Sequence, residues 1–162
     1  MKNIINMRIM IMFIPGLVMV CASIVYCHCQ IPCGIYDDKA RFDMIAEHIT
    51  TIEKSMKQIT ELSGKDKPNM NQIVRWVDNK EKHADELSHI VTYYFMAQRL
   101  RPLDKSRGKA YEEYIKKLTL LHEMLIYSMK AKQTTDLSNV ERLKDSLAKF
   151  RAAYFPGQGV KP

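Results

Sequence analysis

The residues best suited to chemistry are gathered in one short stretch, HCQIPCGIY, at positions 28–36. Cys29 and Cys33 offer two thiolates, which are soft ligands that favour transition metals. His28 offers an imidazole nitrogen, and its α-amine would be a second nitrogen donor if the chain began at this residue. The types and spacing of these residues therefore indicate a metal site made of sulfur and nitrogen.

The order of the donors favours square-planar coordination. The amine of His28, the amide nitrogen of Cys29 and the thiolate of Cys29 can form fused five-membered rings around one ion, and Cys33 can fill the fourth position. Pro32 fixes one backbone angle and Gly34 permits unusual ones, which suits the curl required. Such a plane suits Ni(II) or Cu(II), whereas zinc prefers a tetrahedron. With the imidazole as an optional fifth ligand above the plane, the site could cycle nickel between +2 and +3.

Residues 1–27 are expected to be a cleaved signal peptide. Two basic residues precede an uncharged apolar run, 9–27, and Val25 and Cys27 are small enough for the cleavage positions. A cut after Cys27 would make His28 the first residue. The alternative is an uncleaved membrane anchor, since the run is just about long enough to span a bilayer.

Four amphipathic helices are expected to follow and to carry the site. Apolar side chains recur at spacings of three and four, with Asp37 and Asp38 at the start of the first helix. The apolar stripes occupy residues 42–62, 71–99, 111–129 and 140–154. Short links between them predict an all-α fold, an antiparallel four-helix bundle over 37–155, with a flexible tail at 156–162.

The remaining histidines are expected to play no metal-binding part. They are scattered over three of the predicted helices, as His48, His83, His89 and His122. Each is expected to be a surface or capped histidine, and we expect no H-x-x-E pairing that would indicate a di-iron site. Trp76, the methionines and the aromatic stripe are expected to form the core.

The charge of the chain argues against a nucleic-acid partner. The formal net charge is +7, but basic and acidic residues are interspersed and no aromatic-basic motif is present. A modest positive field instead favours encounter with small anions.

The stretch HCQIPCGIY resembles the nickel hook H-C-x-x-P-C-G-x-Y of nickel superoxide dismutases. The helical remainder is also similar to that family, and VRWVDNKEKHA at 74–84 resembles the second helix of its variants. The resemblance implies an enzyme that converts two superoxide anions into O2 and H2O2 through a Ni(III)/Ni(II) cycle, with one nickel ion per subunit. It also implies a homohexamer of four-helix bundles, matured by proteolysis that exposes the histidine.

Carried over by position, the resemblance implies that His28, Cys29 and Cys33 are the nickel ligands, with the His28 imidazole axial in the oxidised state. Tyr36 would stand near the open face, where it would exclude larger molecules and order water beside the substrate. Gln30 replaces the aspartate that founding members have at the third hook position.

The family holds its axial imidazole through a glutamate and an arginine. Asp43 or Glu47, one helical turn apart, could supply the acid here. No arginine is in register for its partner, and Lys80 or His83 could substitute.

Two other functions remain open from the sequence. One is a secreted, non-enzymatic helical bundle that binds nickel or copper. The other is a membrane-anchored interaction module in which Cys29 and Cys33 form a local disulfide. The signal peptide predicts export to a periplasm, the exterior or an organelle lumen, with no membrane association after cleavage.

Overall fold

A computed structural model describes residues 38–156, and within this range the chain is helical with no strand. The four α-helices are α2 (Asp38–Ser63), α3 (Met70–His89), α4 (Lys109–Gln133) and α5 (Ser138–Tyr154). A π-helical segment, η1 (Ile90–Arg99), continues α3, and a short 3-10 turn, η2 (Lys105–Arg107), precedes α4. The predicted signal peptide, the stretch 28–36 and, apart from Pro156, the predicted tail lie outside the described residues.

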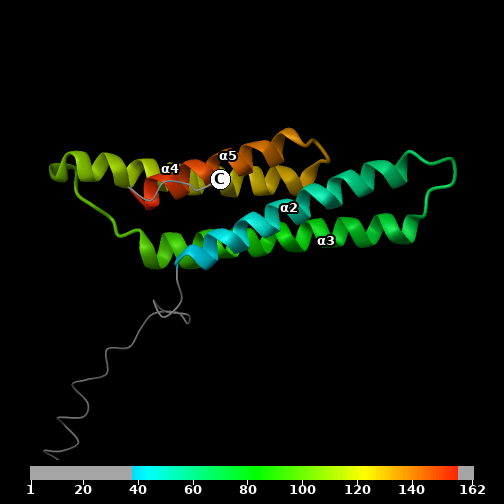
Figure 1. Cartoon of the computed structure of the whole chain (residues 1–162), viewed down its shortest axis with the longest axis horizontal. Coiled ribbons are helices and arrows are strands. Elements are labelled where there is room, and N and C mark those ends of the chain that lie inside the picture. Colours follow the sequence, from blue (N-terminus) through cyan, green and yellow to red (C-terminus); the bar gives the residue numbers. More distant parts are fainter. Residues whose placement is uncertain (1–37, 157–162) are drawn as a thin grey trace, which may run out of the picture. The chain divides into compact units, whose positions relative to one another are not determined.

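The helices form the expected antiparallel bundle. In Figure 1, α2 and α3 run side by side as one hairpin and α4 and α5 form a second. The hairpins pack on each other through α3 against α4 and α2 against α5. Capping agrees with local chemistry, since the side chain of Asn69 accepts a hydrogen bond from the backbone N–H of Gln72 at the start of α3. The sequence prediction of an all-α four-helix bundle is therefore confirmed.

Aromatic side chains of the core gather near the start of α2. Phe42, Phe95 and Phe150 come from α2, η1 and α5, and all three are fully buried. The ring centroids of Phe42 lie 4.9 Å from Phe95 and 5.2 Å from Phe150, in edge-on and stacked arrangements. Because Phe42 is only one turn into α2, this cluster holds the first turns of that helix in the core.

The prediction that Trp76 and the methionines belong to the core is wrong in part. Met56 and Met124 are buried, but Trp76 is only partly buried and Met70 is 63% exposed. Figure 1 shows that the hairpin of α2 and α3 extends past the turn between α4 and α5. The apolar stripe of α3 therefore begins beyond the reach of α4 and α5, and its first residues are exposed to solvent in the single chain.

The π-helical segment η1 was not foreseen, because an apolar stripe at spacings of three and four does not reveal a local change in helical pitch. The backbone N–H of Leu100 bonds to the carbonyl of Phe95, five residues earlier, at 2.9 Å. This wider turn sets side chains five residues apart next to each other, and π-helical turns are frequent at functional sites. No helix in the range 38–156 has the length and apolar character needed to cross a membrane.

Candidate metal centre

The strongest candidate ligands, His28, Cys29 and Cys33, lie outside the described residues, as does Tyr36. Their expected roles remain predictions. The structure does describe the helix that follows these residues in sequence, because α2 starts at Asp38, two residues after Tyr36.

The carboxylate of Asp38 joins three elements of the bundle. From η1, Tyr94 donates its hydroxyl proton to Asp38, and the Nε of Arg99 donates to the same oxygen at 2.8 Å. From α5, the hydroxyl of Tyr154 donates to the second oxygen of Asp38 at 2.8 Å. The Asp38 side chain is 27% exposed and that of Arg99 is 18% exposed, so solvent screens the pair only in part. The first turn of α2 is thus tied to η1 and α5 by a charge-assisted network.

The π-helical pitch of η1 makes this network possible. Tyr94 and Arg99 are five residues apart, and Arg99 donates a second hydrogen bond, from its terminal nitrogen to the Tyr94 hydroxyl, at 2.8 Å. The guanidinium carbon of Arg99 also lies 4.6 Å from the centre of the Tyr94 ring, within cation–π range. The sequence did not reveal Arg99 as a partner of Asp38, because the two residues lie 61 positions apart along the chain.

The network also sets protonation states. Burial is the largest single influence on the pKa of Asp38 and raises it, but hydrogen bonds from the two tyrosines and Arg99 together lower this pKa below the ordinary value of 3.8. Burial, and next the hydrogen bond to Asp38, raise the pKa of Tyr94 and of Tyr154. At neutral pH Asp38 is therefore ionised, while both phenols keep the protons that they donate.

Loss of the Asp38 charge should destabilise the bundle. We expect Asp38→Asn to lower the free energy of unfolding at pH 7 by about 2 kcal/mol, the usual scale for hydrogen bonds to a charged group. The folded-state pKa of Asp38 is depressed, so its contribution is present above pH 3.8 and fades as the pH falls through the folded pKa. The difference between wild type and variant should therefore shrink in acid. Urea unfolding at several pH values measures it.

Asp145→Asn is a matched control, since Asp145 forms a surface pair with Lys149 and is 47% exposed. Such a pair contributes about 0–1 kcal/mol. An equal loss in both variants at pH 7 would contradict the role given to Asp38.

A shallow cavity of about 240 Å³ opens beside the network and shares Arg99 and Tyr154 with it. Basic side chains outnumber acidic ones in its lining, which includes Arg99, Arg101 and Lys117 but only one carboxylate, that of Glu113. This side of the bundle therefore presents a local positive field to small anions.

The two carboxylates expected behind the metal ligands differ in their surroundings. Asp43 pairs with Arg151 of α5, with Oδ1 of Asp43 3.2 Å from the guanidinium, while its side chain is 57% exposed. Glu47 lies one turn further along α2, exposed to solvent. Arg151 is the arginine that the sequence did not reveal, because it lies 108 residues from Asp43 along the chain.

The two substitutes considered for that arginine are engaged elsewhere. Lys80 is buried, and its ammonium group donates to the backbone carbonyls of Lys132 and Thr134 at the end of α4, at 2.5 and 3.2 Å. Burial lowers the pKa of Lys80, an effect that its neighbour Glu81 opposes. His83 faces His48 and not Asp43.

The expectation of a surface or capped residue for each of the other histidines does not describe two of them. His48 of α2 and His83 of α3 meet with their Nδ1 atoms 2.9 Å apart, and Glu86 approaches both. His83 and Glu86 also have the H-x-x-E spacing that the sequence prediction did not recognise as a pairing. His89, by contrast, stacks on Tyr93 at the surface, with ring centroids 4.5 Å apart.

Comparison with known proteins gave one finding. The sequence model of the family described as nickel-containing superoxide dismutase matches residues 23–157. The match includes the stretch 28–36 and all four helices. No curated protein and no solved structure matches the chain significantly.

Proposed function

This chain belongs to the nickel-containing superoxide dismutase family, and from that premise we propose that residues 28–36 are its nickel site. The protein is an oxidoreductase that requires nickel and converts superoxide to O2 and H2O2. The observation that carries the proposal is the donor set of the stretch, which the family match covers in full.

The donors in this stretch fit nickel. Cys29 and Cys33 supply two thiolates, and the amine of His28 with the amide nitrogen of Cys29 supplies two nitrogens. Soft sulfur donors and a planar arrangement suit Ni(II), and electron-rich thiolates make its oxidation easier. When bound, nickel would supply one-electron chemistry by alternating between +2 and +3: one superoxide would give up an electron and leave as O2, and a second would take up an electron and two protons and leave as H2O2.

The residues of the chain would bind the metal, exclude molecules larger than superoxide and order water beside it. The imidazole of His28 would be a further nitrogen donor to the oxidised metal, and Pro32 and Gly34 would shape the backbone around the ligands. Tyr36 would exclude larger molecules with its ring and order water beside the anion with its hydroxyl, as the family resemblance implies. Asp38 anchors the chain two residues later, because its carboxylate is held by η1 and α5.

Asp43 and Arg151 are the acid–arginine pair that orients the His28 imidazole in this proposal. Support comes from their contact at 3.2 Å and from the position of Asp43 in the second turn of α2. A partner that fixes the orientation of a histidine ligand commonly changes metal affinity or activity by about 10–100-fold. Glu47, one turn further along α2, is the alternative candidate for the acid.

Export and assembly are further parts of the proposal. Residues 1–27 act as a signal peptide, and the mature protein forms a homohexamer without membrane attachment. Exposed apolar side chains support an assembly, among them Met70, Val74 and Val77 at the far end of the hairpin of α2 and α3. Sedimentation of the nickel-loaded protein measures the assembly, and a monomer would rule out the hexamer.

Metal content and turnover together test the proposed site. We expect the active protein to contain about one nickel ion per chain, consistent with a single hook motif. After removal of the metal, nickel should restore dismutation, measured by pulse radiolysis, and zinc should not. Full turnover with zinc or iron but not with nickel would contradict the proposal. Nickel binding without dismutation would favour the alternative of a non-enzymatic metal-binding bundle.

A further inference from the structure

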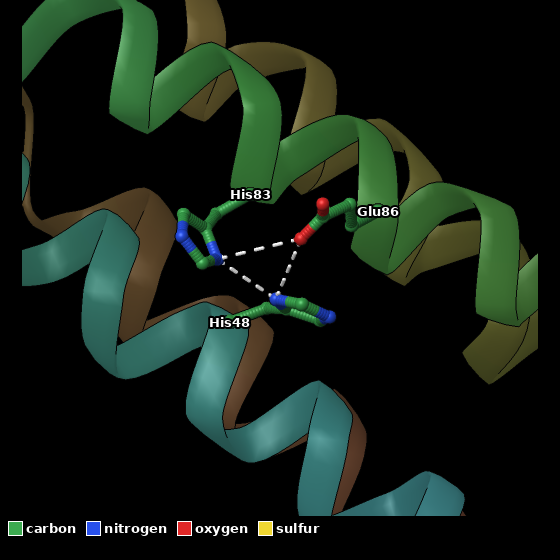
Figure 2. Close-up of side chains that lie close together, drawn as sticks. All are labelled: His48, His83 and Glu86. Carbon is green, nitrogen blue, oxygen red and sulfur yellow. Dashed lines mark hydrogen bonds and ion pairs between the residues drawn. The ribbon is translucent and has the colours of Figure 1, made fainter.

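Three metal-binding side chains converge between α2 and α3, away from the stretch 28–36 in sequence. Figure 2 shows His48 rising from α2 toward His83 and Glu86 of α3, with their ligand atoms turned to one another. The Nδ1 atoms of His48 and His83 lie 2.9 Å apart, and Oε2 of Glu86 lies 3.5 Å from the first and 3.7 Å from the second.

The spacing of these atoms is that of ligands around one ion. Bonds of about 2.0–2.1 Å in a tetrahedron place neighbouring ligand atoms about 3.3 Å apart. The three observed separations, 2.9, 3.5 and 3.7 Å, fall on both sides of that value. Small side-chain shifts would therefore complete the coordination, with no change in the backbone of either helix.

A simple hydrogen bond between the two imidazoles explains less of this arrangement. It accounts for the contact of the two Nδ1 atoms, but the carboxylate oxygen lies beyond ordinary hydrogen-bond distance from both nitrogens. The two oxygens of Glu86 also divide their contacts, since Oε1 faces Lys82 at 3.9 Å while Oε2 faces the histidines. One carboxylate oxygen thus remains directed at the imidazole pair.

Burial of the two histidines favours the binding of a cation. The His48 side chain is 12% exposed and that of His83 is 22% exposed. Burial is the main influence that lowers the pKa of His48, His83 adds to the lowering, and Glu86 opposes it. The neutral imidazole, which is the form that binds metals, is therefore favoured. Glu86 is 43% exposed, so an ion can enter from solvent and a water molecule can complete its coordination.

We propose that His48, His83 and Glu86 form a second metal site that binds a divalent first-row cation, with zinc the representative ion. Two imidazoles and one carboxylate suit zinc, copper or nickel, and they do not suit magnesium or calcium, which prefer oxygen ligands throughout. The bound ion joins α2 to α3 across 35 residues of sequence. This site shares no ligand with the nickel hook and does not depend on the hook assignment.

Zinc added to the nickel-loaded mature protein tests the site while the hook is filled. We expect equilibrium dialysis against micromolar zinc, followed by elemental mass spectrometry, to give about one zinc ion per chain with the nickel content unchanged. His48→Gln, His83→Gln and Glu86→Gln should each raise the dissociation constant for zinc at least about tenfold. Zinc should raise the melting temperature of the wild type and not that of the variants, because it binds only the folded site.

Two controls lie on the same helix. His89→Gln removes a histidine that stacks on Tyr93, and Asp85→Asn removes the carboxylate next to Glu86 that pairs with Lys132. Both should bind zinc as the wild type does. Glu86→Gln keeps side-chain volume at the most exposed ligand, so the test does not rest only on substitutions at the buried histidines.

Three results would overturn the proposal. The first is no zinc uptake at micromolar concentration. The second is uptake matched by loss of nickel, which would place zinc in the hook. The third is equal uptake by His48→Gln and His89→Gln, which would place zinc elsewhere on the protein.

Discussion

Cys29→Ser and Cys33→Ser are each expected to abolish dismutation, with a loss of more than about 100-fold in rate. Loss of a direct ligand should exceed the 10–100-fold effects typical of residues that only orient ligands. A serine hydroxyl is not ionised at neutral pH and is a poor nickel ligand. The substitution therefore removes a thiolate donor that would stabilise the oxidised state of the metal. Pulse radiolysis measures the rate, and elemental analysis of the same samples measures nickel.

The bundle should fold normally in both cysteine variants. Its core is formed by buried side chains of α2, α3, η1, α4 and α5, all after residue 37. Helical content and melting temperature in the absence of metal should therefore match those of the wild type. A variant that dismutes superoxide at the wild-type rate would remove that cysteine from the ligand set.

The bundle was predictable from the sequence because its signals are local. An apolar stripe of period three to four needs only neighbouring residues to be recognised, and the predicted stripe 42–62 lies within α2 (Asp38–Ser63). The same signal cannot show which part of an apolar stripe is left without a neighbouring helix packed against it. Trp76 and Val77 continue the pattern of α3, yet Trp76 is partly buried and Val77 is 38% exposed.

Pairings between distant segments were not predictable in the same way. Asp38 meets Arg99 across 61 residues, and Asp43 meets Arg151 across 108. Neither arginine is set apart by composition from the other basic residues of the chain. The first pairing depends on the π-helical pitch of η1, and the second depends on how α5 packs on α2.

The cluster of His48, His83 and Glu86 carried a partial signal. The i, i+3 spacing of His83 and Glu86 places both on one face of α3. The third ligand could be identified only once α2 and α3 were paired in register, because His48 lies 35 residues from His83. Each histidine considered alone is more often a surface residue, which is why the prediction treated it as one.

One extra residue before His28 is expected to abolish activity as completely as loss of a thiolate. The added residue converts the terminal amine of His28 into a peptide nitrogen and moves the free amine away from Cys29. The planar nitrogen donor of the proposed site is then lost, although both cysteines and the imidazole remain. A mature protein prepared with a single alanine before the histidine tests this, and intact mass confirms which residue comes first.

His28→Gln separates the amine from the imidazole in the same experiment. This variant keeps a free terminal amine, and so would keep that nitrogen donor, but it lacks the ring nitrogen that would be the further donor in the proposed site. Nickel content should therefore stay near that of the wild type while the dismutation rate falls at least about tenfold, as expected when a group that tunes a metal is lost. The extended protein should instead lose rate and nickel affinity together. Wild-type activity in the extended protein would show that the amine is not a ligand, and wild-type activity in His28→Gln would show that the axial imidazole takes no part in the cycle. Together the two variants therefore test whether the mature chain has to begin with histidine.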